Sequence, residues 1–310
     1  MKPAEGHPDV ANSLNSLAVL YYYQDEFAQA EPLFKRVIAI YEKAYGPDHP
    51  DLLSFRGNLA ALYRSQGRLD KSVPLFEEVL KAQEVKLGRQ HPNTLRNVAQ
   101  LGANYRDAGR LAEAIPLLEE AYRASNHHSP RSWVGVELLD AYSRAADPSK
   151  PESTARAMAL VQELLGAARA TLPKDSPELA GQLALFGPHL LTLKAWDEAE
   201  PLIREALTTR EARAPDDWRT FHTKSMLGGA LLGQSNLADA ERLLLDGYRG
   251  MKEREVAIPP QRKVRILEAL ERLVRLYEAK GNETEAAAWR SKLEAARAEQ
   301  GKLDAKGGGG

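Results

Sequence analysis

Hydrophobic residues recur at three- and four-residue steps along most of the chain, in blocks separated by short polar turns. Three segments of the first 125 residues align without gaps: LNSLAVLYYYQDEFAQAEPLFKRVIAIY, RGNLAALYRSQGRLDKSVPLFEEVLKAQ and VAQLGANYRDAGRLAEAIPLLEEAYRAS. Steps of three and four residues are typical of amphipathic helices, and turns such as QGRL divide each segment into two such helices. Each segment is therefore predicted to form a helix hairpin.

The three segments repeat with a period of 42 residues, as the dipeptides beginning at His7, His49 and His91 show. Apolar and small residues match at fixed offsets within each segment. The matching sets are Leu17, Leu59 and Leu101; Ala18, Ala60 and Gly102; Tyr21, Tyr63 and Tyr105; Ala30, Ser72 and Ala114; and Phe34, Phe76 and Leu118. Self-similarity at a fixed period indicates stacked supersecondary units.

Each of the three histidines is followed by proline and then by Asp9, Asp51 or Asn93. Proline is tolerated at the first helical position, where its missing N–H has no partner to lose, and polar or acidic residues suit the first turn. A shared metal site is excluded by distance, because packed helices lie about 8–10 Å apart whereas zinc ligands approach one ion to about 2.0–2.1 Å. The three histidines are therefore predicted to begin helices.

A weaker form of the pattern continues to the end of the chain. Hairpins are expected to begin near residues 8, 50, 92, 130, 177, 217 and 260, which makes residues 1–300 one solenoid and residues 301–310 a flexible glycine-rich tail. Residues 143–190 are expected to be irregular, because the loop Ala145–Ser153 lengthens the fourth unit and Pro188 falls inside a helix, where it should kink the backbone.

The spacing of Leu, Gly or Ala, Tyr, Ala and Phe resembles the tetratricopeptide repeat (TPR) family, specifically in the first three units and more loosely in the last four. The 42-residue period, with LAALYRSQGR, AEPLF and GPDHPD, is similar to the repeats of kinesin light chains and of many bacterial proteins. This resemblance implies an all-α fold, a right-handed solenoid of about seven antiparallel helix hairpins, and a bacterial source.

Composition narrows the class of protein further. Hydrophobic residues make up 43% of the chain and charged residues 27%, with a formal net charge of −1, which favours a globular protein and gives no general attraction for nucleic acid. The sequence has no cysteine, no apolar run long enough to span a bilayer and no charged-then-apolar leader. A cytoplasmic location without membrane contact is expected.

Candidate chemistry is sparse. No Walker loop, dinucleotide fingerprint, HExxH sequence or nucleophile elbow is present. The adjacent pair His127-His128 lacks a third ligand, and Glu137 with Asp140, three residues apart on one helix, has no partner motif for acid–base catalysis. We therefore expect no enzymatic activity, no cofactor and no metal.

By the same resemblance, the first helix of each hairpin lines the inner, ligand-binding face of the solenoid. At 100° per residue, the face opposite the core positions carries these candidate groove residues: Asn12, Asn15, Tyr22, Tyr23, Arg64, Arg96, Arg106 and Arg144. Small residues between them, at Gly57, Ala61, Ala99 and Ala103, are expected to leave room for an extended peptide. Arg64 and Arg106 are expected to bind its carboxylates without being needed by the core.

Repeat solenoids present extended concave surfaces, and TPR proteins generally hold peptide segments there. The predicted function is therefore a non-catalytic scaffold that binds a protein or peptide partner, as part of a larger multidomain protein. The resemblance suggests a serine/threonine kinase or caspase-like protease as the accompanying domain. The alternative is a self-assembling solenoid whose apolar ends stack; of the oligomeric states, a monomer is favoured.

Overall fold

The computed structural model describes residues 8–47, 49–125, 133–147 and 150–307. These residues contain fourteen α-helices, two short 3-10 helices and no strand. The helices are α1 (Pro8–Tyr23), α2 (Phe27–Tyr45), α3 (Pro50–Ser65), α4 (Leu69–Leu87), α5 (Pro92–Asp107), α6 (Leu111–Ala124), α7 (Trp133–Ala145), α8 (Pro151–Thr171), α9 (Pro177–Thr192), α10 (Trp196–Arg213), α11 (Trp218–Gly233), α12 (Leu237–Glu253), η1 (Glu255–Ala257), η2 (Pro260–Arg262), α13 (Val264–Ala279) and α14 (Glu283–Gly307). The predicted all-α class is confirmed.

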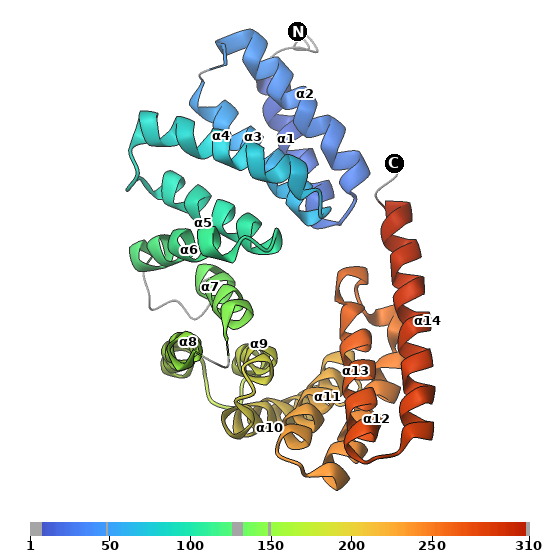
Figure 1. The fold of residues 1–310 in the computed structure, drawn as a ribbon. Helices are drawn as coiled ribbons and strands as arrows, with labels where there is room; N and C mark the ends of the chain where they lie inside the picture. Colours follow the sequence, from blue (N-terminus) through green and yellow to red (C-terminus); the bar gives the residue numbers. More distant parts are fainter. Residues whose placement is uncertain (1–7, 48, 126–132, 148–149, 308–310) are drawn as a thin grey trace. The chain divides into compact units, whose positions relative to one another are not determined.

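The helices group into two compact units, and the boundary between the units falls within α7, between Ala141 and Tyr142. In the first unit, α1 packs on α2, α3 on α4 and α5 on α6, and α2 also packs on α3 and α4 on α5 (Figure 1). The first helices begin at Pro8, Pro50 and Pro92. Their stacking buries one stripe of each helix, as the hydrophobic period requires.

Small residues allow the helices of each hairpin to approach closely. In the first hairpin Ala18 and Ala30 are fully buried against Phe34, and Leu62 of the next hairpin completes this cluster. Leu17 differs from its repeat equivalents: its side chain is 39% exposed, whereas those of Leu59 and Leu101 are buried. The expectation that all three occupy equivalent core positions is therefore wrong for Leu17.

In three hairpins, a tyrosine on the first helix donates a hydrogen bond to a glutamate on the second helix of the preceding hairpin. The hydroxyl of Tyr63 donates to Glu31 (3.2 Å), that of Tyr105 to Glu77 (2.7 Å) and that of Tyr277 to Glu241 (2.9 Å). Burial and the adjacent carboxylate raise the pKa of Tyr105 and of Tyr277 to about 12. Each phenol therefore stays protonated at neutral pH and keeps donating between successive hairpins.

The histidines before α3 and α5 cap these helices. Nδ1 of His49 accepts a hydrogen bond from the backbone N–H of Asp51 (3.3 Å), and Nδ1 of His91 accepts from that of Asn93 (3.2 Å). Each bond satisfies a donor of the first turn that has no partner within the helix. His7 lies outside the described residues.

We expect His91→Ser to leave stability within about 0.5 kcal/mol of the parent, because serine caps helices by the same kind of bond. His91→Ala should cost about 1 kcal/mol, since alanine offers no acceptor. Urea unfolding followed by circular dichroism checks both values, and metal analysis of the His91→Ser variant should show no change. Equal losses for serine and alanine would show that the histidine ring stabilises the helix by packing instead.

In the second unit, α9 packs on α10, α11 on α12 and α13 on α14. Ser176 caps α9 through the N–H of Leu179 (3.1 Å), and Asp217 caps α11 through that of Arg219 (2.7 Å). Gly228 permits close packing, because a Cβ atom there would lie 2.7 Å from Cγ of Leu244. Helix α9 contains Pro188 and continues beyond it to Thr192.

The boundary between the units lies within α7, the first helix of the fourth hairpin expected from the sequence. In the loop between α7 and α8, the Ser153 hydroxyl accepts a hydrogen bond from the N–H of Asp147 (3.0 Å) and donates to the carbonyl of Lys150 (2.8 Å). At the other end of the second unit, α14 continues to Gly307, so that the stretch expected to be a flexible tail is helical as far as this residue. No described helix combines the length and apolar character needed to span a membrane.

Candidate binding surfaces

The predicted groove face of the first unit is a row of side chains joined across successive first helices. Asn58 donates to Asn15 (3.3 Å), Tyr22 and Ser65 share a hydrogen bond (3.0 Å), and Arg64 donates to Asp107 (2.7 Å). Each pair is 43 residues apart, one repeat plus one residue. The same face of α1, α3 and α5 therefore lies in register, and we call it the polar row.

Aromatic side chains lie at the α1 end of the polar row. The ring of Tyr22 packs on those of Tyr23 and Phe27, with centroids 5.6 and 6.0 Å apart. Tyr23 is 78% exposed, whereas Tyr22 is half-buried. Asn12, also exposed, accepts a hydrogen bond from the hydroxyl of Tyr41 (2.9 Å). Tyr23 thus offers a large apolar surface to solvent beside Tyr22, whose hydroxyl is held by Ser65.

Arg64 and Arg106 belong to an ion-pair cluster with three carboxylates, which we call the arginine cluster. Arg64 contacts Asp107 (2.7 Å) and Glu137 (3.3 Å). Arg106 contacts Asp107 (2.6 Å), Asp140 (3.0 Å) and Glu137. The two arginine side chains are only 19% and 11% exposed. The expectation that they are available for a ligand's carboxylates is wrong, because carboxylates of the same unit already occupy them.

The electrostatics of the cluster follow from this pairing. Burial alone would raise the pKa of Asp107, but Arg64 and Arg106 hold it below its usual value. Burial alone would likewise lower the pKa of the Arg64 guanidinium. The attraction of Glu137 and Asp107 outweighs the effect of burial and raises this pKa. Two guanidinium groups facing three carboxylates leave the cluster with a net charge of about −1. Glu137 and Asp140, considered above for acid–base catalysis, thus lie against Arg106.

The remaining predicted groove residues are placed differently from one another. Arg96 on α5 is exposed. Arg144, near the end of α7, is also exposed, and this residue belongs to the second unit. Ala99 and Ala103 are fully buried, so they do not open space along the face as expected. Gly57 has room beside it, since a Cβ atom there would meet only Oδ1 of Asn97 at 3.9 Å.

A cavity in the second unit was not predicted from the sequence. Its volume is about 630 Å³, within the usual range for ligand sites. The first helices α9, α11 and α13 supply most of its lining, with the α9–α10 turn and the start of α10. The lining residues are Pro188, Leu191, Thr192, Lys194, Trp196, Gly229, Leu232, Gly233, Glu268, Glu271, Arg272, Arg275 and Ala279.

Two glycines of α11 shape this cavity. A Cβ atom on Gly233 would lie 2.2 Å from the indole of Trp196, and one on Gly229 would lie 3.0 Å from Cδ of Arg272. Both distances are shorter than ordinary contacts between carbon atoms. The glycines therefore let Trp196 and the Arg272 side chain lie directly against the α11 backbone and form the walls.

The charged residues of the cavity fall into two groups. Arg272 donates to Ser225 (3.2 Å) and to Glu268 (3.4 Å), and Glu271 pairs with Arg297 (2.7 Å).

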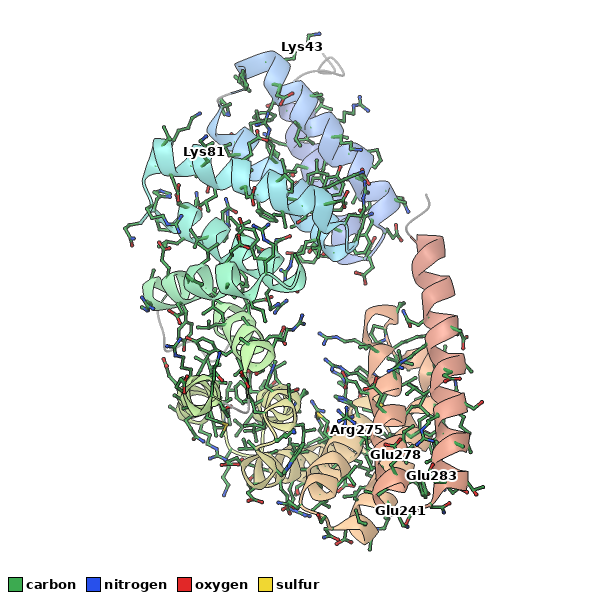
Figure 2. The ribbon with its side chains drawn as sticks, in the orientation of Figure 1. Lys43, Lys81, Glu241, Arg275, Glu278 and Glu283 are labelled. Atoms are coloured by element: carbon green, nitrogen blue, oxygen red, sulfur yellow. The ribbon has the colours of Figure 1, made fainter. Side chains whose placement is uncertain are left out.

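The side chains of Lys194 and Arg275 are exposed, and neither side chain has a hydrogen bond or ion pair with any residue that the structure describes. Figure 2 labels Arg275 on α13, together with Glu278 of the same helix, whose carboxylate bonds Arg290 (2.5 Å). The cavity therefore combines apolar walls with two unpaired cations.

A buried histidine lies behind the cavity. Nε2 of His222 on α11 has no hydrogen-bond partner in the described structure and lies 3.7 Å from the carboxylate of Glu268, beyond hydrogen-bond distance. Burial lowers the pKa of His222 to about 4, and the nearby Arg272 and Arg265 add to this shift. Burial alone would raise the pKa of Glu268, but His222, Arg265 and Arg272 lower it to about 2. At neutral pH the histidine is neutral and the glutamate is ionised.

Within the described part of the chain, no three His, Asp or Glu side chains are grouped so that they could hold a metal ion. The pair His127-His128 lies outside the described residues.

One family model matches most of the first unit. Residues 9–84 and 51–126 each match the family model described as tetratricopeptide repeat. No curated protein matches the chain.

Solved structures extend the likeness to most of the chain. A protein solved as the apo form of RapI covers 94% of this chain and 99% of its own, with 11% identity and a TM-score of 0.69. A tetratricopeptide repeat protein from Parabacteroides merdae covers 92% and 93%, with 14% identity and a TM-score of 0.61. Nearly identical TPR-like repeats assigned to a kinesin light chain of Podosopora anserina cover 67% and 98%, with 23% identity and a TM-score of 0.57.

The fold of the chain and its similarity to these solved structures define the class of protein: an all-α repeat protein built from stacked TPR-type helix hairpins. Repeat solenoids of this kind present extended concave surfaces that serve for binding.

Proposed function

We propose that the chain is a non-catalytic scaffold that binds a peptide segment of a partner protein, and that the 630 Å³ cavity of the second unit anchors this segment. The observation that carries the proposal is the pair of unpaired cations, Lys194 and Arg275, at a cavity lined by three first helices. Polar groups without partners beside an apolar surface are typical of binding sites.

The chemistry of the cavity selects the segment it would bind. Lys194 and Arg275 favour a carboxylate, and Pro188, Leu191 and Leu232 favour an apolar side chain next to it. The two carboxylates of the lining do not compete, because Glu268 and Glu271 are already paired with arginines. The proposed ligand is therefore an extended segment with Asp or Glu adjacent to a large apolar residue.

The predicted groove face of the first unit is proposed as a second contact region. Tyr22 and Tyr23 resemble aromatic interface anchors, and Asn12, Asn15 and Arg96 are proposed as further polar contacts for the partner. Arg64 and Arg106 have a different role from the one expected from the sequence, because their carboxylate partners fix them within the arginine cluster. Arg144, on the second unit, remains a proposed peptide contact.

The proposal is tested by selecting peptides from a random display library on the full chain. Segments with an acidic residue beside a leucine, isoleucine, methionine or phenylalanine should be enriched over the input library. The variant Lys194→Glu/Arg275→Glu should bind the selected peptides at least about tenfold more weakly, a loss of about 1.4 kcal/mol. Both side chains are exposed, so the variant should unfold at the temperature of the parent.

Lys43→Glu/Lys81→Glu is the matched control, because it makes the same change in charge at exposed lysines of the first unit (Figure 2). This control should bind the selected peptides like the parent. If the cavity variant and the control select the same peptides with the same affinity, the cavity is not the anchoring site.

The alternative function, self-assembly of solenoids, is favoured by one observation on α1. Leu17 and Leu20 are 39% and 52% exposed on this helix. Exposed leucines in neighbouring turns of one helix are typical of a helix that packs on another element. Light scattering should show a mass that rises with protein concentration if copies associate through α1, and a constant monomer mass excludes this function.

A further inference from the structure

A second, smaller cavity of the second unit lies where the start of α9, the end of α10 and the start of α11 meet. Its volume is about 230 Å³, and its lining includes Gly181, Thr209, Arg210, Arg213, Asp217 and Arg219. None of these residues lines the larger cavity. The two sites are therefore separate, and binding at the smaller one does not depend on the proposed peptide-binding function.

Arg210 on α10 is the central residue of this cavity. Its Nη1 donates to the carbonyl of Arg219 (3.0 Å) and to the hydroxyl of Thr223 (2.5 Å). Its Nε and Nη2 have no acceptor among the residues that the structure describes. These two nitrogens form the edge of a guanidinium that binds carboxylate and phosphate groups through two parallel hydrogen bonds. The fork of Arg210 is therefore held in place from one side and free on the other.

The charge around Arg210 is unbalanced. Burial lowers the pKa of Arg210 to about 10, and the neighbouring Arg219 adds to this effect while Asp217 opposes it. Asp217 pairs with Arg219, at 2.9 Å, rather than with Arg210. Arg213 is exposed and has no acidic partner in the described part of the chain. Three arginines and one aspartate give the cavity a net charge of about +2.

We propose that this cavity binds a phosphate dianion, either free or as a phosphate monoester. A partly buried guanidinium without a carboxylate is costly, and an oxyanion on its free edge would offset that cost. The charge of a phosphate group at neutral pH, about −1.5 to −2, matches the cavity, whereas a single carboxylate would leave a cation unbalanced. The fork of Arg210 would hold two phosphate oxygens, and Arg213 would cover a third.

The test is a calorimetric titration of the full chain with inorganic phosphate at pH 7.5 and low salt. We expect saturable one-to-one binding that is at least about tenfold weaker in Arg213→Glu and in Arg210→Lys. The lysine keeps the charge but lacks the fork, so its loss separates bidentate binding from general attraction. Lys81→Glu, an exposed reversal in the first unit, should bind phosphate like the parent.

Two further titrations sharpen the result. Acetate should bind at least about tenfold more weakly than phosphate, because it carries one charge instead of two. N-acetyl-phosphoserine methylamide separates the sources: tighter binding than inorganic phosphate assigns the site to a phosphorylated side chain, and weaker binding assigns it to free phosphate.

Circular dichroism must show that Arg213→Glu is folded, as its exposed position predicts. The proposal is overturned if neither phosphate compound saturates the chain, if acetate binds equally well, or if folded Arg213→Glu and Arg210→Lys bind phosphate like the parent.

Discussion

Replacing Arg64 and Arg106 together by glutamate should destabilise the first unit by at least about 3 kcal/mol. Removing one partner of a buried ion pair typically costs about 3–5 kcal/mol, because the remaining charge stays buried without compensation. Here the change would bring two new carboxylates against Asp107, Glu137 and Asp140, where two cations now stand. A typical domain has a free energy of unfolding of only about 5–15 kcal/mol, so much of the unit's stability would be lost.

Amide hydrogen exchange of the full chain measures this effect separately in each unit. Protection in α3, α5 and the start of α7 should fall in the double variant, while α9–α14 should exchange as in the parent. The matched control is Lys81→Glu/Arg96→Glu, which makes the same change in charge at two exposed positions of the first unit. Unchanged protection in Arg64→Glu/Arg106→Glu would show that the cluster contributes little, as the sequence suggests.

The sequence predicted the repeating part of this structure well, because each repeat follows the same local rules. The hydrophobic period predicted the helices, and the dipeptides at His49 and His91 predicted where helices begin; both histidines indeed cap the next turn. These features depend on residues a few positions apart, which a single sequence displays directly.

The partners of Arg64 and Arg106 were missed for two reasons. Arg64 and Asp107 are 43 residues apart, as are Asn15 and Asn58. A search of the sequence for charge pairs separated by one repeat plus one residue could therefore have revealed the first pair. Glu137 could not be found in this way, because its contact with Arg64 spans 73 residues, which is not a multiple of the repeat. A repeat pattern shows which face a side chain occupies, but not which charges from other repeats reach it.

The cavity of the second unit was missed for a related reason. Its three first helices begin at Pro177, Trp218 and Val264, so their spacing is irregular and residues of adjacent helices cannot be aligned by one offset. The glycines of α11 form no recognisable binding motif in the sequence. Their role depends on Trp196 and Arg272, which come from other helices and have no local signal in the sequence.

Lowering the pH from 7 to 5 should weaken the second unit by about 2 kcal/mol through His222 alone. The folded-state pKa of this histidine, about 4, lies below the value of about 6.5 expected in the unfolded chain. Below pH 6.5 the unfolded state therefore binds a proton that the folded state does not, and stability falls as the pH falls until about pH 4. Each pH unit within this window costs about 1.4 kcal/mol.

The carboxylates do not account for a loss in this range. The pKa of Glu268 is about 2 in the folded protein and about 4.5 in the unfolded chain. Its ionised form therefore stabilises the fold above about pH 4.5, and this stabilisation is lost only as the pH falls below that value. Loss of stability between pH 7 and 5 is thus a signature of buried histidine. His222→Gln, which cannot titrate, should flatten the pH dependence of amide exchange in α11 and α13, whereas His91→Ser in the first unit should leave it unchanged.

A direct measurement keeps this prediction testable if His222→Gln proves too unstable to study. Proton NMR of the parent should show the His222 ring still neutral at pH 5.5, with its Nε2 beside the ionised Glu268. A histidine that titrated near 6.5 in the folded protein would take up its proton equally in both states, and the stability of the second unit would then not depend on it. Since Glu268 lines the larger cavity and holds Arg272 there, protonation of His222 would bring a new cation against this pair. Acid unfolding of the second unit is therefore expected to begin at the wall of the proposed peptide site.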